Sequence, residues 1–395
     1  DKQLIKNNSI SEYQQEFREL SFKMMTIKDW REWVDLYIEI IDWEIRLSEI
    51  NDSTMSEILD GQKSEANSLF SKFISKKYSS WVKINDGPTL SNNLIQNHLI
   101  EELGSKPTIF IVIDNLRYDQ WKVIEPLVLD YYTKEKELAY YSILPTTTQY
   151  ARNSLFAGLL PSEIKEKYPQ YWKDDYESGG KNLFEYELLD KHLKKTYKDE
   201  IKHDYTKITN LKNGKKLSRN LKDKLGNKLT TIVYNFVDML SHSKTEMEII
   251  KELASNDKSY RSLTKSWFQN SPLFDIIKNA QELGFKLVIT TDHGTINVKN
   301  PAKIIGDKNT SQNLRYKTGK SLTYNEKENL VFKNPSEIFL PKSSLNSSFV
   351  FSKEDFYLVY PNNFNHFSNY FKNTYQHGGV SMEEMIIPFI VLNPK

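Results

Sequence analysis

The sequence predicts an α/β fold with a mostly parallel central sheet, preceded by a small helical bundle. Apolar residues recur at three- and four-residue spacing through residues 10–83, which contain no proline and no strand pattern. Further along, continuous apolar runs that end in Asp alternate with helical patterns, as is typical of strands buried on both faces of a parallel sheet. These runs cover residues 107–114, 230–238 and 286–292.

The helical region is expected to contain three helices. Ser11 is suited to cap the first and Thr26 the second, and the third begins near Ser53 or Thr54. Three tryptophans of this region are expected in its core: Trp30, Trp33 and Trp43. The expected organisation is a helical bundle over residues 1–84, a linker over 85–106 and an α/β domain over 107–395.

Within the α/β domain, further helices and strands follow from the same patterns. The expected helices begin at about Leu116 and cover roughly residues 244–256 and 260–283. The expected later strands lie near 330–333, 348–359 and 385–392. Because open α/β sheets assemble their sites beyond the carboxyl ends of their strands, the three Asp residues that end strands are candidate site residues.

Composition limits the chemistry available. The 395 residues include no Cys, which excludes a disulfide scaffold, thiolate metal sites and a cysteine nucleophile. Any metal must therefore be held by His, Asp and Glu. The apolar runs are far shorter than the roughly 18 residues of a spanning helix and no signal peptide opens the sequence, so we expect a cytoplasmic protein. The sequence begins with Asp1 rather than Met, which suggests that an upstream domain is missing.

The net charge of +2 hides an uneven distribution. Residues 191–229 hold thirteen basic and four acidic residues, an excess of +9, so the remainder of the chain sums to −7. This segment is either a solvated Lys-rich surface or an anion-attracting lid.

Three of the seven histidines lie close in sequence to Asp residues or to paired glycines. Asp238 and His242 have the four-residue spacing that brings side chains to one helix face, and Asp292 and His293 are adjacent at a strand end. His377 precedes two glycines, which permit close backbone approach. Each histidine alone is more typical of an ordinary core or surface position. Together with the carboxylate of Asp114, the set indicates a catalytic site for Zn²⁺ or Mn²⁺.

A pair of metal ions would suit in-line displacement at phosphorus, a reaction that needs a nucleophile. The Pro- and Thr-rich loop in residues 144–158 enters a helix and offers threonine hydroxyls. On local sequence alone, threonines that only cap the helix are the more common explanation.

Five motifs occur in an order that resembles the alkaline phosphatase superfamily, and within it the PglZ branch. They are IVIDNLRYD, PTTTQYARNSLFAG, NFVDMLSH, TTDHG and YQHGGVSMEEMIIP. The resemblance covers residues 107–395 and is nearest to the effector domain of PorX-type response regulators. The helical region is similar to the middle domain of those regulators. The resemblance therefore implies an alkaline-phosphatase-like sandwich, an absent receiver domain, and a basic cap insertion at about 160–229.

The resemblance also implies ligands for two Zn²⁺ ions, with Mn²⁺ as the alternative. One ion would be held by Asp238, His242 and His377. The other would be held by Asp114, Asp292, His293 and the nucleophile.

In related sulfatases and nucleotide pyrophosphatases, the nucleophile precedes a helix-embedded glycine by ten residues. Here that glycine is Gly158, so the nucleophile would be Thr148, and Arg152 resembles the arginine that orients it or a bound oxygen. A threonine departs from the sulfatases and the phosphomutases and is similar to the pyrophosphatase and phosphodiesterase choice. Three basic residues are expected phosphate contacts that could equally pair with surface carboxylates: Arg117, Arg315 and Lys317.

These observations predict a zinc-dependent phosphodiesterase or phosphatase that cleaves nucleotide or oligonucleotide diesters through a phospho-Thr intermediate. The resemblance implies a role as effector of a two-component regulator of type IX secretion, with phosphorylation-linked homodimers. The alternative is a signalling module with a structural or vestigial metal site, which binds the cytoplasmic part of the secretion motor and a sigma factor. A phosphomutase is a third hypothesis, and the absence of Ser at residue 148 speaks against it.

Overall fold

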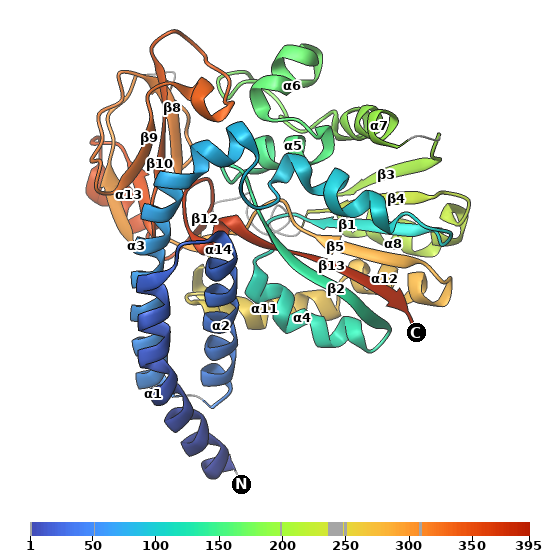
Figure 1. The fold of residues 1–395 in the computed structure, drawn as a ribbon, viewed down its shortest axis with the longest axis horizontal. Helices are drawn as coiled ribbons and strands as arrows, with labels where there is room; N and C mark the ends of the chain where they lie inside the picture. Colours follow the sequence, from blue (N-terminus) through green and yellow to red (C-terminus); the bar gives the residue numbers. More distant parts are fainter. Residues whose placement is uncertain (1, 51, 198–199, 236–247, 249–250, 308–309) are drawn as a thin grey trace.

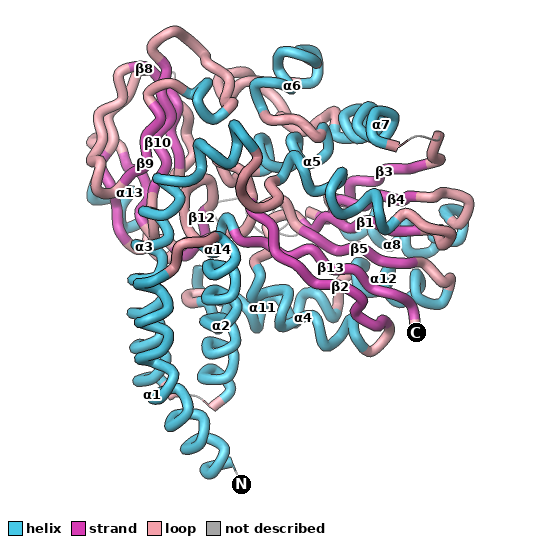
Figure 2. The backbone as a smooth tube through the Cα atoms, in the orientation of Figure 1, coloured by secondary structure: helices cyan, strands magenta, loops and turns pink. Residues whose placement is uncertain are grey.

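The computed structural model describes the chain except at residues 1, 51, 198–199, 236–247, 249–250 and 308–309. A bundle of long helices stands beside a layered α/β body, and a group of smaller sheets lies above the bundle in the view of Figure 1. The strands of the α/β body run side by side between helices (Figure 2).

Six strands of the described chain form the central sheet, in the order β2-β13-β5-β1-β4-β3. The last four run parallel to one another, whereas β13 pairs antiparallel with both β5 and β2. In sheet order, the strands are β2 (Tyr132–Tyr141), β13 (Ile386–Pro394), β5 (Lys286–Thr290), β1 (Thr108–Ile113), β4 (Leu229–Tyr234) and β3 (His203–Ile208). Every residue of β1 and β4 is buried, as strands covered on both faces require. The predicted α/β class with a mostly parallel sheet is confirmed.

Helices cover both faces of this sheet. Figure 1 shows α4, α11 and α12 along one face and α5 and α7 on the other side. The helices of the α/β body are α4 (Tyr118–Leu129), α5 (Asn153–Ala157), α6 (Pro161–Lys167), α7 (Glu185–Thr196), α8 (Leu211–Arg219), α11 (Asp257–Gln269) and α12 (Pro272–Glu282). The expectation of one continuous helix over 260–283 is wrong, because a second helix, α12, begins there. The Ser271 side chain caps it by accepting from Phe274 N, and Pro272 occupies its first turn. The helix expected over 244–256 lies mostly outside the described residues.

The helical bundle consists of α1 (Lys2–Thr26), α2 (Trp30–Glu49) and α3 (Ser53–Ile84). The first helix begins well before Ser11. Thr26 ends α1 instead of capping α2, and its hydroxyl donates to carbonyls of its own helix. Asp29 caps α2: its carboxylate accepts from Arg31 N at 2.8 Å, and Glu32 accepts from Asp29 N at 2.9 Å. This reciprocal pair explains why the start of α2 is shifted from the expected position.

The bundle and the α/β body share one apolar core. Trp33 and Trp43 are buried, as expected for core residues. Tyr141, at the end of β2, lies with its ring centroid 5.3 Å from that of Trp81 in α3, and its hydroxyl donates to Trp30 O at 2.9 Å. The end of a sheet strand is therefore enclosed by bundle side chains.

Smaller sheets follow β5 along the chain. They are β8-β10-β9, β11-β7 and β12-β6. Their strands are β6 (Ile296–Asn297), β7 (Asn300–Lys303), β8 (Tyr316–Lys320), β9 (Asn329–Phe332), β10 (Ser347–Ser352), β11 (Phe356–Val359) and β12 (Tyr375–Gln376). The expected strand over 348–359 is two strands, because Glu354 has a left-handed backbone (φ 51°) that turns the chain between β10 and β11. The short helices α13 (Phe364–Phe371) and α14 (Met382–Met385) complete this region.

Short 3-10 and π turns occupy several connections. They are η1 (Ser91–Asn93), η2 (Ile95–Leu99), η3 (Ile100–Glu102), η4 (Thr148–Arg152), η5 (Pro169–Tyr171), η6 (Leu221–Lys224) and η7 (Pro335–Ile338). The first three lie in the segment 85–106, which was expected to be only a linker.

Residues 160–229, expected as a cap insertion, are partly built into the sheet. They supply α6, η5 and α7, and also the edge strand β3, which pairs along its length with β4. The sequence did not reveal β3 because its residues are only half-buried and lack a continuous apolar run.

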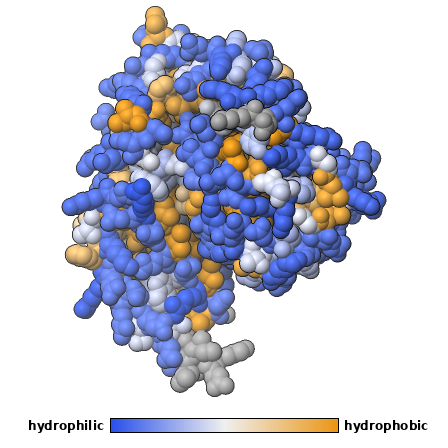
Figure 3. All heavy atoms as spheres, turned by 45° about the vertical axis from the view of Figure 1, so that its right-hand side comes forward, coloured by the Kyte–Doolittle hydropathy of each residue, from blue (hydrophilic) through white to orange (hydrophobic). Residues whose placement is uncertain are grey.

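None of the helices that the structure describes combines the length and apolar character needed to cross a membrane. The face drawn in Figure 3 is largely hydrophilic, with hydrophobic side chains in separate groups.

Candidate functional site

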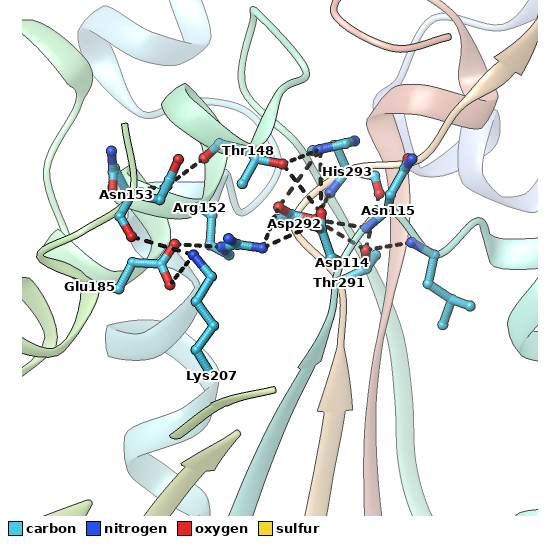
Figure 4. Close-up of polar contacts among 12 residues, drawn as sticks. Asp114, Asn115, Thr148, Arg152, Asn153, Glu185, Lys207, Thr291, Asp292 and His293 are labelled. Carbon is cyan, nitrogen blue, oxygen red and sulfur yellow. Dashed lines mark hydrogen bonds and ion pairs between the residues drawn. The ribbon is translucent and has the colours of Figure 1, made fainter. Parts of the chain in front are cut away.

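The site is built where two neighbouring parallel strands end. Asp114 directly follows β1, and its amide continues the ladder to β4 by donating to Tyr234 O at 2.9 Å. Asp292 and His293 follow β5, which pairs with β1. The sheet thus brings potential ligand atoms of Asp114, Asp292 and His293 within 4.8 Å of one another, and all three residues are buried (Figure 4).

Backbone amides hold the carboxylate of Asp292. Its Oδ1 accepts from Asn115 N at 3.1 Å and from His293 N at 3.0 Å. The adjacent Thr291 hydroxyl accepts from Leu116 N at 2.9 Å, which ties the two strand ends together. Asp292 Oδ2 is buried and has no hydrogen-bond partner among the described residues. A buried carboxylate oxygen without a hydrogen bond is chemically suited to bind a cation.

The two carboxyl groups are electrostatically unequal. Burial, followed by the charge of Asp114, raises the pKa of Asp292 to about 7. Burial also acts to raise the pKa of Asp114, but Arg152, His293 and His377 together outweigh it and hold that pKa below its ordinary value. Asp114 is therefore ionised at neutral pH, while Asp292 sits near its midpoint in the absence of a bound cation.

Both histidines direct one ring nitrogen, Nδ1, to a backbone carbonyl. His293 Nδ1 lies 3.0 Å from Gly294 O, and His377 Nδ1 lies 3.2 Å from Thr146 O. Because a carbonyl only accepts, the proton is assigned to each Nδ1 and the lone pair to each Nε2. The rings stack with centroids 4.3 Å apart. Burial lowers the pKa of His293, and burial together with His293 lowers that of His377 to about 4, so both rings are neutral and suited to bind metal.

Thr148 places its hydroxyl against this group. Its Oγ1 lies 3.3 Å from Asp114 Oδ1 and 3.2 Å from His293 Nε2, at the start of η4 (Figure 4). The neighbouring threonines differ. Thr146 Oγ1 donates to a backbone carbonyl at 3.0 Å, and Thr147 Oγ1 is buried with no partner in the described structure.

Arg152 lies between two acidic groups (Figure 4). Its Nη1 is 3.3 Å from Asp114 Oδ2 and 3.6 Å from Asp292 Oδ2. On its other side, Nε donates to Glu185 Oε1 at 2.6 Å, and Tyr205 donates its hydroxyl to the same carboxylate. The guanidinium is therefore held in place, and it only partly neutralises the pair of carboxylates.

Two supporting residues escaped sequence analysis. Glu185 orients Arg152, and Asn182 donates to Thr148 O at 2.9 Å and to Asn153 Oδ1 at 3.0 Å. Neither belongs to a motif, and an acidic residue that opens a helix is most often explained by the helix dipole alone.

The other expected ligands divide into two cases. His377 is brought beside His293, as described above. Asp238 and His242 lie outside the described residues.

The arginines expected to contact phosphate use their donors elsewhere. Arg117 donates from Nε to Asp119 Oδ1 and from Nη1 to Asp257 Oδ1, at 2.8 Å in both cases. Arg315 pairs with Glu384 through Nη2 at 2.7 Å and Nε at 3.1 Å. Both arginines are fully buried, and these carboxylates are buried or half-buried rather than at the surface. In the described structure both arginines form buried ion pairs, and their role as phosphate contacts stays a prediction.

Lys317 is also buried. Its ammonium lies 4.7 Å from the centroid of the Tyr360 ring, and burial lowers its pKa to about 7. The expected contact of Lys317 with phosphate stays a prediction.

Comparison with known families places this architecture. Residues 91–392 match the BREX system PglZ alkaline phosphatase-like domain. This chain belongs to the PglZ family. Residues 3–82 of the same chain match the PorX response regulator linker domain, so the bundle is of that type. The PglZ match includes the Asp114, Thr148 and Asp292 positions. No curated protein matches the sequence.

Some solved structures are similar to this PglZ chain in part. One is the murine ectonucleotide pyrophosphatase/phosphodiesterase 5, an inactive form in complex with AMP, with 10% identity and a TM-score of 0.47. The match covers 73% of this chain and 88% of that one. Another is phosphonoacetate hydrolase from Sinorhizobium meliloti in complex with phosphonoformate, with 11% identity, a TM-score of 0.43, and coverage of 72% and 89%.

Proposed function

We propose that this PglZ chain is a metal-dependent phosphodiesterase that cleaves nucleotide or oligonucleotide diesters with Thr148 as its nucleophile. The observation that carries the proposal is the position of the Thr148 hydroxyl, 3.3 Å from Asp114 Oδ1 and 3.2 Å from His293 Nε2. A hydroxyl held between a carboxylate and a neutral imidazole, at the carboxyl ends of sheet strands, is suited to nucleophilic attack.

The residues present fit a divalent cation. Asp292 Oδ2 is buried without a hydrogen-bond partner in the described structure, and burial, followed by the charge of Asp114, raises the pKa of Asp292. With neutral imidazoles and no Cys in the sequence, the donor set is nitrogen and oxygen, which suits Zn²⁺ and also Mn²⁺. Asp114, Asp292, His293 and Thr148 would hold one ion. His377 would hold a second, with Asp238 and His242.

When bound, such ions lower the pKa of a coordinated hydroxyl or water and offset charge on the phosphoryl group. The chain itself supplies the nucleophile and its alignment. Thr148 Oγ1 loses its proton towards the adjacent carboxylates and forms a bond to phosphorus, while the bond from phosphorus to the leaving alkoxide breaks in line. The alkoxide takes up a proton. Water then displaces Thr148 from phosphorus, which releases a phosphomonoester and restores the hydroxyl. Arg152 keeps the carboxylates in place throughout.

The proposed polyanionic substrate rests on the basic segment 191–229, with its excess of +9. Several of its basic side chains are exposed to solvent, among them Lys212, Lys215, Arg219 and Lys222. An electropositive surface attracts a phosphate backbone more strongly than a single neutral ester.

The PorX-type linker domain supports a second, compatible role. In this role, the chain is a cytoplasmic effector of a two-component regulator of type IX secretion, contacts the secretion motor and a sigma factor, and forms homodimers. Substitution of the metal ligand Asp292 by Ala would abolish catalysis and leave such partner binding intact.

The replacement Thr148→Val tests the catalytic proposal. Valine keeps the branched shape and removes the hydroxyl, so we expect turnover of a nitrophenyl phosphodiester to fall by about 10³-fold or more, with metal content unchanged. Thr147→Val is the matched control, since the hydroxyl of Thr147 forms no hydrogen bond in the described structure. Undiminished turnover by Thr148→Val would exclude Thr148 as the nucleophile.

A further inference from the structure

Helix α3 of the helical bundle makes side-chain contacts with the part of the PglZ domain that carries the site histidines. Asn67 of α3 is buried, with 4% of its surface exposed. Its Nδ2 donates to Glu383 Oε2 at 2.9 Å, and its Oδ1 accepts from Met382 N at 2.8 Å. One amide therefore uses both its donor and its acceptor on consecutive residues of another domain.

Those two residues belong to a short buried turn, residues 381–384, which we call the 381–384 turn. Ser381 caps α14 and donates its hydroxyl to Glu384 Oε2 at 2.6 Å. Figure 1 shows α14 where the bundle meets the start of β13. Lys63, one turn before Asn67 on α3, adds an ion pair to Glu383 with a 3.3 Å separation. The turn is thus fixed from the bundle side.

From this turn, Glu384 reaches both histidine segments. Its Oε1 accepts from Gly379 N at 3.0 Å, two residues after His377. Its backbone carbonyl accepts from Gly294 N at 3.0 Å, the residue after His293. A Cβ on Gly294 would lie only 1.8 Å from Glu383 O, so the two backbones are in direct contact. A shift of the turn would therefore move the backbone on which both imidazoles are mounted.

We propose that Asn67 is a positioning residue of the metal site, which acts from the linker domain through the 381–384 turn and Glu384 on the backbone of His377 and His293. This inference rests on the metal site of the proposed function and extends it to a residue outside the PglZ domain. Groups that orient metal ligands typically change metal affinity by about 10- to 100-fold when they are removed.

Asn67→Asp tests the proposal because it keeps the acceptor for Met382 N and places a carboxylate against Glu383. We expect Zn²⁺ binding to the apo protein to weaken by about tenfold or more. We also expect kcat on a phosphodiester to fall with a smaller change in KM, since ligand placement and not substrate contact is altered. Amide hydrogen exchange at Gly379 and Gly294 should accelerate, while Ile111 in β1 keeps its protection.

Rescue and control variants separate positioning from general destabilisation. The double variant Asn67→Asp/Glu383→Gln restores a donor opposite the new carboxylate and should recover Zn²⁺ affinity to within about threefold of the unaltered protein. Gln62→Ala removes buried and half-buried hydrogen bonds inside the bundle, to Tyr13, Phe17 and Ser21, and leaves the contacts of the 381–384 turn unchanged. It should lower the melting temperature and leave Zn²⁺ affinity unchanged.

Several outcomes would overturn the proposal. They are unchanged Zn²⁺ affinity and glycine exchange in Asn67→Asp, an equal loss of affinity in Gln62→Ala, or no recovery in the double variant. If Asn67→Asp does not fold, Asn67→Ser carries the same expectation, because a hydroxyl is too short to bridge both partners. Zn²⁺ binding that fails in the unaltered protein counts against the proposed function, whereas the glycine exchange tests the positioning role without metal.

Discussion

At the scale of single residues, the charge balance of the site decides its behaviour. Asp114 and Asp292 are buried together, and Arg152, their cationic neighbour in the described structure, is also paired with Glu185. Burial, followed by the charge of Asp114, raises the pKa of Asp292 to about 7, so without a bound cation a proton takes its place. Metal and proton therefore compete for the same carboxylate.

This competition predicts a pH-dependent metal affinity. Asp292 is mostly ionised above pH 7 and increasingly protonated below it, so Zn²⁺ affinity should fall by up to about tenfold per pH unit as the pH drops from 7 to 5. The histidines contribute little to this slope while they remain neutral. Titration of the apo protein with Zn²⁺ at several pH values measures the slope.

Asp292→Asn is the control for that experiment, since an amide cannot take up the proton. Its Zn²⁺ affinity should be lower overall and nearly independent of pH between 6 and 8. If the Zn²⁺ affinity of Asp292→Asn depended on pH as steeply as that of the unaltered protein, the competing proton would belong to another group.

Much of this site could be predicted, and the missing parts have a common cause. Asp114, Asp292 and His293 follow apolar strands, so the strand pattern itself draws attention to them. Asn67, Glu185 and Glu384 act through contacts between elements far apart in the sequence. No local periodicity records such contacts. The carboxylate partners of Arg117 and Arg315 depend on the tertiary fold in the same way.

At the scale of elements, caps explain where helices begin better than apolar periodicity does. The start of α2 depends on the reciprocal bonds between Asp29 and Glu32, and α12 begins at Ser271 although the apolar pattern continues across it. Sequence periodicity correctly predicted three bundle helices, but not their ends. The charged strand β2 was missed because its middle, residues 133–137, is largely exposed and lacks an apolar stripe.

Asp29→Ala should lower the free energy of unfolding by about 1 kcal/mol, because it removes the acceptor for the first turn of α2. Asp29→Asn is the matched control: it also loses the exposed ion pair to Arg31 but keeps a capping oxygen. Denaturant unfolding compares the two. Equal losses in both variants would mean that the charge, and not the cap, stabilises α2.

At the scale of the whole molecule, the bundle and the PglZ domain behave as one packed body. Tyr141 ends a sheet strand among the rings of Trp30, Phe70 and Trp81, inside the core cluster that spans both regions. Two family matches, to the PorX linker and to PglZ, therefore meet in a single apolar core. We expect the two regions to unfold together.

Tyr141→Ala tests that expectation. Loss of the ring from this shared core should cost about 3–5 kcal/mol and shift one calorimetric transition of the whole chain to lower temperature. Tyr141→Phe keeps the ring and loses only the hydrogen bond to Trp30 O, with a cost of about 1 kcal/mol. Separate transitions, with only one sensitive to Tyr141, would contradict the common core.

The pairing of β2 with β13 has a consequence for the order in which the protein is made. Tyr141 pairs with Ile386, 245 residues later, and β13 is the neighbour of β2 in the sheet. During synthesis on the ribosome, β2 emerges long before β13, so it stays unpaired until almost the entire domain has been made. Lys134, Glu135 and Lys136 place charges along this waiting strand, and charged edges discourage pairing with other nascent chains. The charged residues that keep β2 from showing an apolar stripe in the sequence thus also disfavour its pairing with other chains before β13 is made.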